Sequence, residues 1–282
     1  MGVTLSDVAG AIEAFSPVGL AESWDRPGLQ VGDPRAAVRT VLVALDPSPR
    51  AVSEAVRQRA QLLATHHPLF LHPLERLDLS SPAGRVVSEL IVSGVGLYSA
   101  HTNLDRAEGG VNDALARRLG LEEVRALGQG EPQVKMVVAT PDLANPSPRR
   151  SAGRLGRLPK PRRAAEWAQD VARALGTEGA RLSGPPETWI EDVAVCGGSG
   201  SSLWREAQRG GAQALVTGDV KYHTALEAAI EGFCLLDLGH ATSERVAVEV
   251  MAAVFRRWAE RAGTELDVRT FWEPDVFLPV PR

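Results

Sequence analysis

Residues 38–65, VRTVLVALDPSPRAVSEAVRQRAQLLAT, decide the fold class of this chain. The apolar run at 38–46 predicts a buried strand that ends in an acidic residue. Ser48 and Pro49 then predict the first residues of a helix, as a cap followed by a proline in the first turn. A second apolar run at 60–65 completes a strand–helix–strand unit, which indicates an α/β fold with a parallel sheet.

Two adjacent histidines, His66 and His67, follow the second strand, and Pro68 ends the regular structure. Adjacent residues of a strand point to opposite faces, so neighbouring histidines do not normally share one ligand. They can serve two metal ions, or one ion from a turn once the strand has ended. A surface turn is the alternative for the pair taken alone, so the other strand ends must decide.

Polar side chains also follow the other predicted strands. The strand at 96–100 is followed by His101 and Asp105, and two later strands are followed by the pairs Asp219 with His223 and His240 with Glu244. Ligands of parallel sheets bind outside the carboxyl ends of the strands, so these groups can converge. Three or four imidazoles with two carboxylates suit Zn, Fe, Mn or Co. Separate polar loop residues are the alternative, which the clustering of the histidines disfavours.

Charge balance favours two divalent metal ions per chain rather than one. Two such ions bring about +4, and two carboxylates leave about +2 for a bridging hydroxide and an anionic substrate to neutralise. A metal pair about 3.5–4 Å apart can lower the pKa of a bridging water and orient its attack. Glu244 is the expected bridging carboxylate. It lies four residues after His240, so a helical turn would place both on one face.

A Gly- and Ser-rich segment that contains Gly198, Ser199 and Gly200 lies between a predicted strand and a predicted helix. Its backbone amides and the helix dipole would suit a phosphate group. A tight turn without a ligand is an equal alternative. Lys221 and His223 could line the same pocket, or could cap and solvate a helix.

Length and composition limit the class of protein. A chain of 282 residues can form one large or two moderate domains. The net charge of −4 argues against a general nucleic-acid-binding surface. No apolar stretch is long enough to span a membrane, and no signal peptide is predicted. The two cysteines form no CxxC motif, which predicts a cytoplasmic protein.

The predicted organisation is two α/β portions joined by a connector. Residues 1–130 form the first portion, 131–163 a strand and a Pro- and Arg-rich connector, and 164–282 the second portion. Residues 141–163 show no sustained period, so we expect a solvated linker. Contact of its arginines with nucleic acid is the alternative.

Six short motifs occur in a fixed order: THHP at 65–68, SAHTNLD at 99–105, GGVN at 109–112, CGGSG at 196–200, TGDVKYH at 217–223 and GHATSE at 239–244. Together they resemble the NIF-three-like dinuclear metal-centre family, whose members are often labelled GTP cyclohydrolase 1 type 2 homologues. The resemblance runs from about residue 20 to the C-terminus. It departs from the family at Arg26-Pro27, where Asn-Val is usual, and it matches the short form without an inserted domain.

The resemblance implies two α/β portions with metals in the cleft between them, assembled as a ring-shaped homohexamer. The family's metal ligands correspond here to His66, His67, Asp105, His240 and Glu244. His101 lies beside them in its motif, as a neighbour of the ligands or an occasional ligand.

These observations predict a metal-dependent hydrolase of a nucleotide-like or phosphorylated substrate. Glu244, His101 and His223 are the candidate catalytic residues, with residues 198–200 as the candidate phosphate contact. The expected partners are an anionic small molecule or nucleotide and further copies of the chain. The alternatives are a non-catalytic metal-binding scaffold and nucleic-acid binding through the arginines of 141–163.

Overall fold

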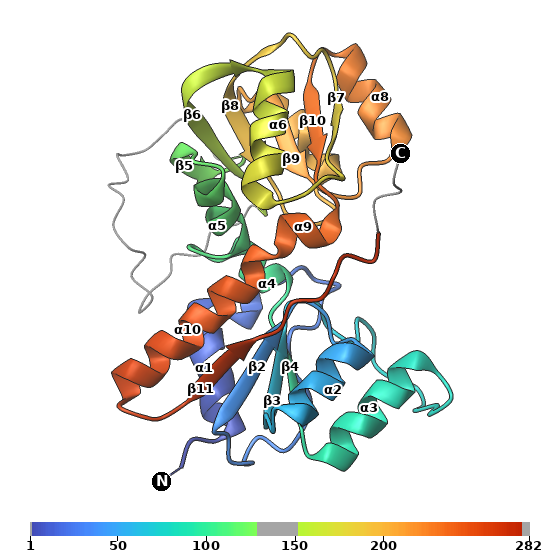
Figure 1. Ribbon diagram of the computed structural model, residues 1–282, viewed down its shortest axis with the longest axis vertical. Coiled ribbons are helices and arrows are strands. Elements are labelled where there is room, and N and C mark those ends of the chain that lie inside the picture. The colour runs from blue at the N-terminus through green and yellow to red at the C-terminus, as the bar shows by residue number, and fades with distance from the viewer. Residues whose placement is uncertain (1, 129–151, 278–282) are drawn as a thin grey trace. The chain divides into compact units, whose positions relative to one another are not determined.

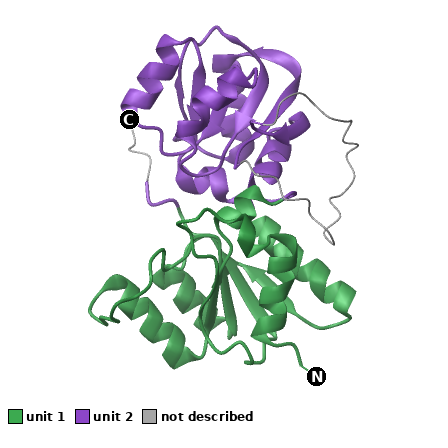
Figure 2. Ribbon diagram, turned by 180° about the vertical axis from the view of Figure 1, so that it is seen from behind, with its two compact units in different colours: residues 1–107, 142–148, 247–274 green, residues 108–141, 149–246, 275–282 purple. Residues whose placement is uncertain are grey.

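The computed structural model describes residues 2–128 and 152–277. They divide into two compact units (Figure 2). Among these residues, unit 1 comprises 2–107 and 247–274, and unit 2 comprises 108–128, 152–246 and 275–277. This division differs from the predicted portions 1–130 and 164–282. The last strand pairs with a strand of unit 1, so residues 247–274 belong to that unit rather than to unit 2.

Unit 1 is built on a mixed five-stranded sheet. In spatial order its strands are β1 (Gly28–Val31), β4 (Gly96–Ser99), β3 (Leu62–Thr65), β2 (Thr40–Ala44) and β11 (Asp267–Thr270). All pairs are parallel except β1 with β4. The predicted strand–helix–strand unit is therefore confirmed, because β2 and β3 are neighbouring parallel strands of mostly apolar, buried residues.

Helices cover both faces of this sheet (Figure 1). The helices of unit 1 are α1 (Leu5–Phe15), η1 (Val18–Leu20), α2 (Pro49–Arg57), α3 (Pro82–Ser93), α4 (Thr102–Arg106) and α10 (Val246–Ala262). Helices α2 and α3 bury their apolar residues against Leu42, Leu63 and Leu97 of the strands. The predicted cap of α2 is present, because Ser48 Oγ accepts a hydrogen bond from Ala51 N at 3.0 Å.

Unit 2 contains a mixed six-stranded sheet. In spatial order its strands are β5 (Glu122–Ala126), β6 (Arg154–Arg163), β8 (Trp189–Val195), β9 (Ala214–Thr217), β10 (Cys234–Asp237) and β7 (Arg181–Ser183). Strands β8, β9 and β10 run parallel, and the other pairs are antiparallel. Its helices are α5 (Val111–Arg118), α6 (Ala164–Leu175), η2 (Ser201–Leu203), α7 (Trp204–Arg209), α8 (Tyr222–Ile230) and α9 (His240–Glu244).

The predicted connector is wrong for residues 154–163, which form the ten-residue strand β6. Pro159 and Pro161 lie where the register of β6 against β8 shifts, between Arg157 and Arg162. A proline has no amide hydrogen to donate, so it is tolerated where a bulge interrupts the ladder. The arginines make ion pairs within unit 2: Arg154 with Asp113, Arg157 with Asp192 and Arg162 with Asp170. Residues 129–151 of the predicted connector region lie outside the described residues.

Parallel strands give each sheet one edge at which several carboxyl ends meet. In unit 1, strand β3 ends directly before His66, and one residue separates the end of strand β4 from His101. In unit 2, strands β9 and β10 lead into Asp219 and His240. The polar motifs therefore follow the strand ends, as the sequence predicts. Over residues 2–128 and 152–277, no helix combines the length and apolar character needed to cross a bilayer.

Candidate metal-ligand sets

Three imidazoles gather at the strand ends of unit 1. The ring centroid of His66 lies 5.1 Å from that of His67 and 5.3 Å from that of His101, and the last two are 5.6 Å apart. One nitrogen from each ring lies within 4.8 Å of the others, a group that could hold a metal ion. The chain leaves β3 at Thr65, so both histidines belong to a bend, where adjacent side chains need not diverge.

Each of these rings makes a hydrogen bond from Nδ1 to a backbone carbonyl or a carboxylate. The pairs are His66 with Ala100 O at 2.8 Å, His67 with Asp46 Oδ1 at 2.7 Å and His101 with Asp25 Oδ1 at 3.0 Å. A carbonyl and an ionised carboxylate only accept, so the neutral ring must carry its hydrogen on Nδ1. The lone pair then lies on Nε2, the form in which a histidine binds a metal ion.

The Asp25 carboxylate is ionised under ordinary conditions. It is buried and also accepts hydrogen bonds from the backbone amide and hydroxyl of Thr102. Burial alone would raise the pKa of Asp25, but the hydrogen bonds from His101 and Thr102 and the attraction of His101 outweigh it. Together they lower that pKa to about 2. Asp25 therefore remains an acceptor for His101 Nδ1.

Asp105 is the carboxylate of this set. It lies on the single-turn helix α4, which begins directly after His101, and its Oδ1 is 3.6 Å from His66 Nε2. Unit 1 thus brings together His66, His67, His101 and Asp105, all of which the sequence analysis selected. The set offers three imidazole nitrogens and one carboxylate.

Unit 2 supplies a second, smaller set on the single-turn helix α9. His240 and Glu244 lie one turn apart as predicted, with His240 Nε2 and Glu244 Oε2 3.0 Å from each other. His240 Nδ1 lies 2.6 Å from Asp219 Oδ2, so this ring also directs Nε2 toward a carboxylate. Asp219 has a positive φ of 53°. Such a conformation is costly for a residue other than glycine and is concentrated at functional sites.

The Gly-rich segment packs directly against α9. A Cβ at Gly198 would lie 3.0 Å from Glu244 Cδ and 3.3 Å from His240 Nε2, so only glycine leaves room for these side chains. Two of its amides donate within unit 2: Gly198 N to Ser243 Oγ at 3.0 Å, and Gly200 N to Thr217 Oγ1 at 2.9 Å. This packing gives the segment a structural role. Phosphate binding by Gly198, Ser199 and Gly200 stays a prediction.

His223 lies apart from these ligand sets. It is an exposed residue of α8, with its ring 5.4 Å from that of Tyr222. Lys221 precedes α8 as its N-cap residue and makes no side-chain cap hydrogen bond. The structure brings His223 to no metal-ligating group among the described residues, and its catalytic role stays a prediction.

Two residues of the site are absent from the predicted site residues. Asp46 follows β2, and the neighbouring parallel strand β3 leads into His67. The strand order could therefore have indicated the contact between Asp46 and His67. Asp25 lies in the turn-rich segment before β1, where no periodic pattern fixes the position of a side chain. Its contact with His101 could not be predicted from spacing.

The family model described as Duf34/NIF3 (NGG1p interacting factor 3) matches residues 3–274 of this chain. A Streptomyces coelicolor protein named GTP cyclohydrolase 1 type 2 homolog is 40% identical over 267 residues, which cover 94% of this chain and 90% of that protein. A Streptococcus pneumoniae protein of the same name is 33% identical, with 93% of this chain and 94% of that protein covered.

Solved structures with the same fold align over nearly the whole chain. A hypothetical protein of Staphylococcus aureus aligns with a TM-score of 0.88 and 28% identity, covering 99% of this chain and 100% of that chain. A Bacillus cereus protein related to NIF3 aligns with a TM-score of 0.87 and 23% identity, covering 99% of each chain, which shows the fold alone.

Proposed function

This chain belongs to the Duf34/NIF3 family, and from that premise we propose that it is a dinuclear metal-dependent hydrolase of a nucleotide-like or phosphorylated substrate. The observation that carries the proposal is the state of four histidines: His66, His67, His101 and His240 each have Nδ1 against an acceptor. Four Nε2 lone pairs fixed in this way are ready to coordinate metal ions without rearrangement.

The ligands suit two divalent ions per chain, in the class of Zn, Fe, Mn or Co. Imidazole nitrogen and carboxylate oxygen are the donors that these metals share, and no cysteine belongs to the candidate groups among the described residues. Asp105 and Glu244 each add one negative charge. In the proposal His66, His67, Asp105, His240 and Glu244 are the ligands, and His101 is a further ligand or a neighbour of them.

Metal ions held by these residues would supply a nucleophilic water at neutral pH and stabilise negative charge on the substrate. The side chains of the protein have the remaining roles. Glu244, buried on α9, is the proposed bridging carboxylate. His101, held at Nδ1 by Asp25, has its Nε2 available for a metal ion or for a proton.

The substrate class rests on charge and on the names of relatives. A centre with two divalent ions and two carboxylates retains a net positive charge, so an anionic substrate fits it. Relatives carry the name GTP cyclohydrolase 1 type 2 homolog, which makes GTP the first substrate to test.

The test compares purified protein loaded with each metal against protein stripped by a chelator, with GTP and a panel of phosphoesters as substrates. We expect metal-dependent turnover that Glu244→Gln abolishes. Glu231→Gln, which changes an exposed glutamate at the end of α8, is the matched control and should retain activity. Absence of turnover of the whole panel by fully metallated protein would refute the hydrolase proposal.

A non-catalytic metal-binding scaffold is the second candidate. A scaffold acts through contacts with other protein chains, and the surface of α8 offers such a contact. Tyr222, Leu226 and Ile230 are spaced four residues apart and are 74%, 44% and 75% exposed. An apolar stripe of this kind indicates a protein contact, and we propose a second copy of the chain as its partner, as in a homohexamer. Sedimentation analysis of Ile230→Asp should show a smaller assembly than the unmodified protein. An unchanged sedimentation coefficient would remove α8 from the interface.

A further inference from the structure

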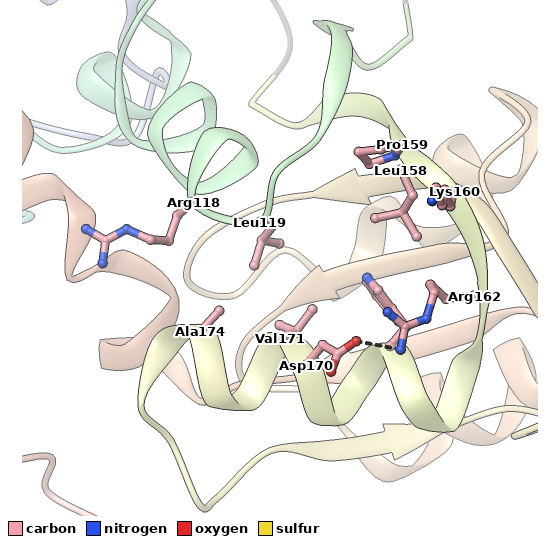
Figure 3. A pocket seen from close by; sticks show the side chains of 10 residues that line it. Arg118, Leu119, Leu158, Pro159, Lys160, Arg162, Asp170, Val171 and Ala174 are labelled. Atoms are coloured by element: carbon pink, nitrogen blue, oxygen red, sulfur yellow. Dashed lines mark ion pairs between the residues drawn. The ribbon is translucent and has the colours of Figure 1, made fainter.

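Unit 2 contains a pocket that none of the metal-ligand residues lines. It has a volume of about 350 Å³ and lies among the end of α5, strand β6 and helix α6 (Figure 3). Its lining residues are Arg118, Leu119, Leu158, Pro159, Lys160, Arg162, Trp167, Asp170, Val171 and Ala174. The volume falls within the range of about 300–1,000 Å³ that is usual for small-molecule sites.

The pocket has an apolar wall of buried side chains. Leu158 of β6 and Trp167 and Val171 of α6 are all buried and contribute to its lining. The indole Nε1 of Trp167 is buried and has no hydrogen-bond partner among the described residues. A buried donor without an acceptor is unusual in a folded protein and calls for an explanation. This wall offers an apolar surface on which a ring or a short alkyl chain can pack.

The rim of the pocket carries positive charge. Arg162 is already paired, since its guanidinium lies 2.8 Å from Asp170 and 3.6 Å from Glu166. Figure 3 shows this pair beside the apolar residues of α6, with Lys160 on the β6 side. Lys160 makes no ion pair with any residue in the described part of the chain. One ammonium group beside an apolar wall therefore lacks a counter-ion.

We propose that this pocket binds a small organic carboxylate with a flat apolar body. The body would pack on Leu158, Trp167 and Val171, and the carboxylate would pair with the Lys160 ammonium. A single negative charge matches the Lys160 ammonium, which makes no ion pair with the described residues. A polyphosphate would leave most of its charge uncompensated, because Asp170 and Glu166 already occupy Arg162. The site therefore differs in ligand class from the proposed metal centre.

Isothermal titration of the full chain with 2-naphthoate tests the proposal, with the neutral 2-naphthalenemethanol as the matched ligand. We expect naphthoate to bind roughly tenfold more tightly than the alcohol, the effect of one charge-assisted contact. Lys160→Gln should remove that difference. Ala174→Phe, at an exposed position of α6 that lines the pocket, should abolish binding of both ligands.

Arg209→Gln is the control, because it removes an exposed positive charge on α7 outside the pocket. It should leave both affinities unchanged. Absence of naphthoate binding to the unmodified protein would overturn the proposal. Equal affinities for the acid and the alcohol would overturn its charged half, and binding that survives Ala174→Phe would place the ligand elsewhere and overturn it entirely. Metal content should be unaffected in every variant, which separates these results from the test of the metal centre.

Discussion

Gly198→Ala should separate the geometry of the metal ligands from the stability of unit 2. Gly198 has a φ of +62°, and its missing Cβ leaves the space that Glu244 and His240 fill. Alanine in this backbone conformation costs about 1–2 kcal/mol of folding free energy. The added methyl would also lie 3.0 Å from Glu244 Cδ and closer to Oε1, where ordinary contacts begin at 3.4 Å. The carboxylate must therefore move by roughly 1 Å. A displacement of this size can lower the reaction rate of a preorganised site by about 100-fold.

Gly176→Ala provides the matched control. Gly176 ends α6 with a φ of +65°, and nothing lies within 4 Å of its added Cβ. Gly198→Ala should lose at least as much stability as Gly176→Ala in chemical unfolding, but only Gly198→Ala should lose bound metal, as measured by elemental analysis after dialysis. Full metal content in Gly198→Ala, at a stability equal to that of Gly176→Ala, would refute the role assigned to this glycine.

Further predictions concern the support of the ligands, the buried tyrosine and the bound metal. Asp46→Asn should weaken metal binding by about 10–100-fold by loosening the His67 ring. Competition with a chromophoric chelator measures this, and an unchanged affinity would count against Asp46. Burial, with the nearby Glu13 carboxylate, raises the pKa of Tyr98 well above the ordinary value of about 10 for a tyrosine. The unfolded chain therefore loses this proton first, so stability present below about pH 10 should fall above it by about 1.4 kcal/mol per pH unit. Urea unfolding of Tyr98→Phe should lack that slope, and an identical slope would contradict the assignment. Protein kept in free metal at about 100 times the dissociation constant should lose about 2.7 kcal/mol of folding free energy when the metal is removed. The loss should be seen as a lower melting temperature in EDTA.

The parallel parts of both sheets could be predicted because local and long-range signals agree. Strands β2 and β3 are short runs of buried apolar residues, and Ser48-Pro49 begins the helix between them. Strand β6 could not be predicted from periodicity. Its prolines and arginines fit a connector, and they are accommodated only because the ladder with β8 is interrupted and acidic partners lie nearby. Those partners belong to other elements, which no local pattern indicates.

The candidate site divides in the same way. The candidate ligands follow strand ends, and their positions in the chain together with the family resemblance selected them. The carboxylates that hold the rings depend on tertiary contacts across many residues: Asp25 is 76 residues from His101, and Asp46 is 21 from His67. The Gly-rich segment has the composition of an anion-binding loop. Two of its amides also support the turn and α9, a role that only the packing of Gly198 against Glu244 reveals.

Metal content of the freshly purified protein tests the central claim most directly. Elemental analysis should find two equivalents of divalent metal per chain, and the proportions should identify the metal. His66→Ala and His240→Ala should each fall below two equivalents while their circular dichroism spectra match that of the unmodified protein. Retention of two full equivalents in either variant, or only trace metal in the unmodified protein after reconstitution, would contradict the account.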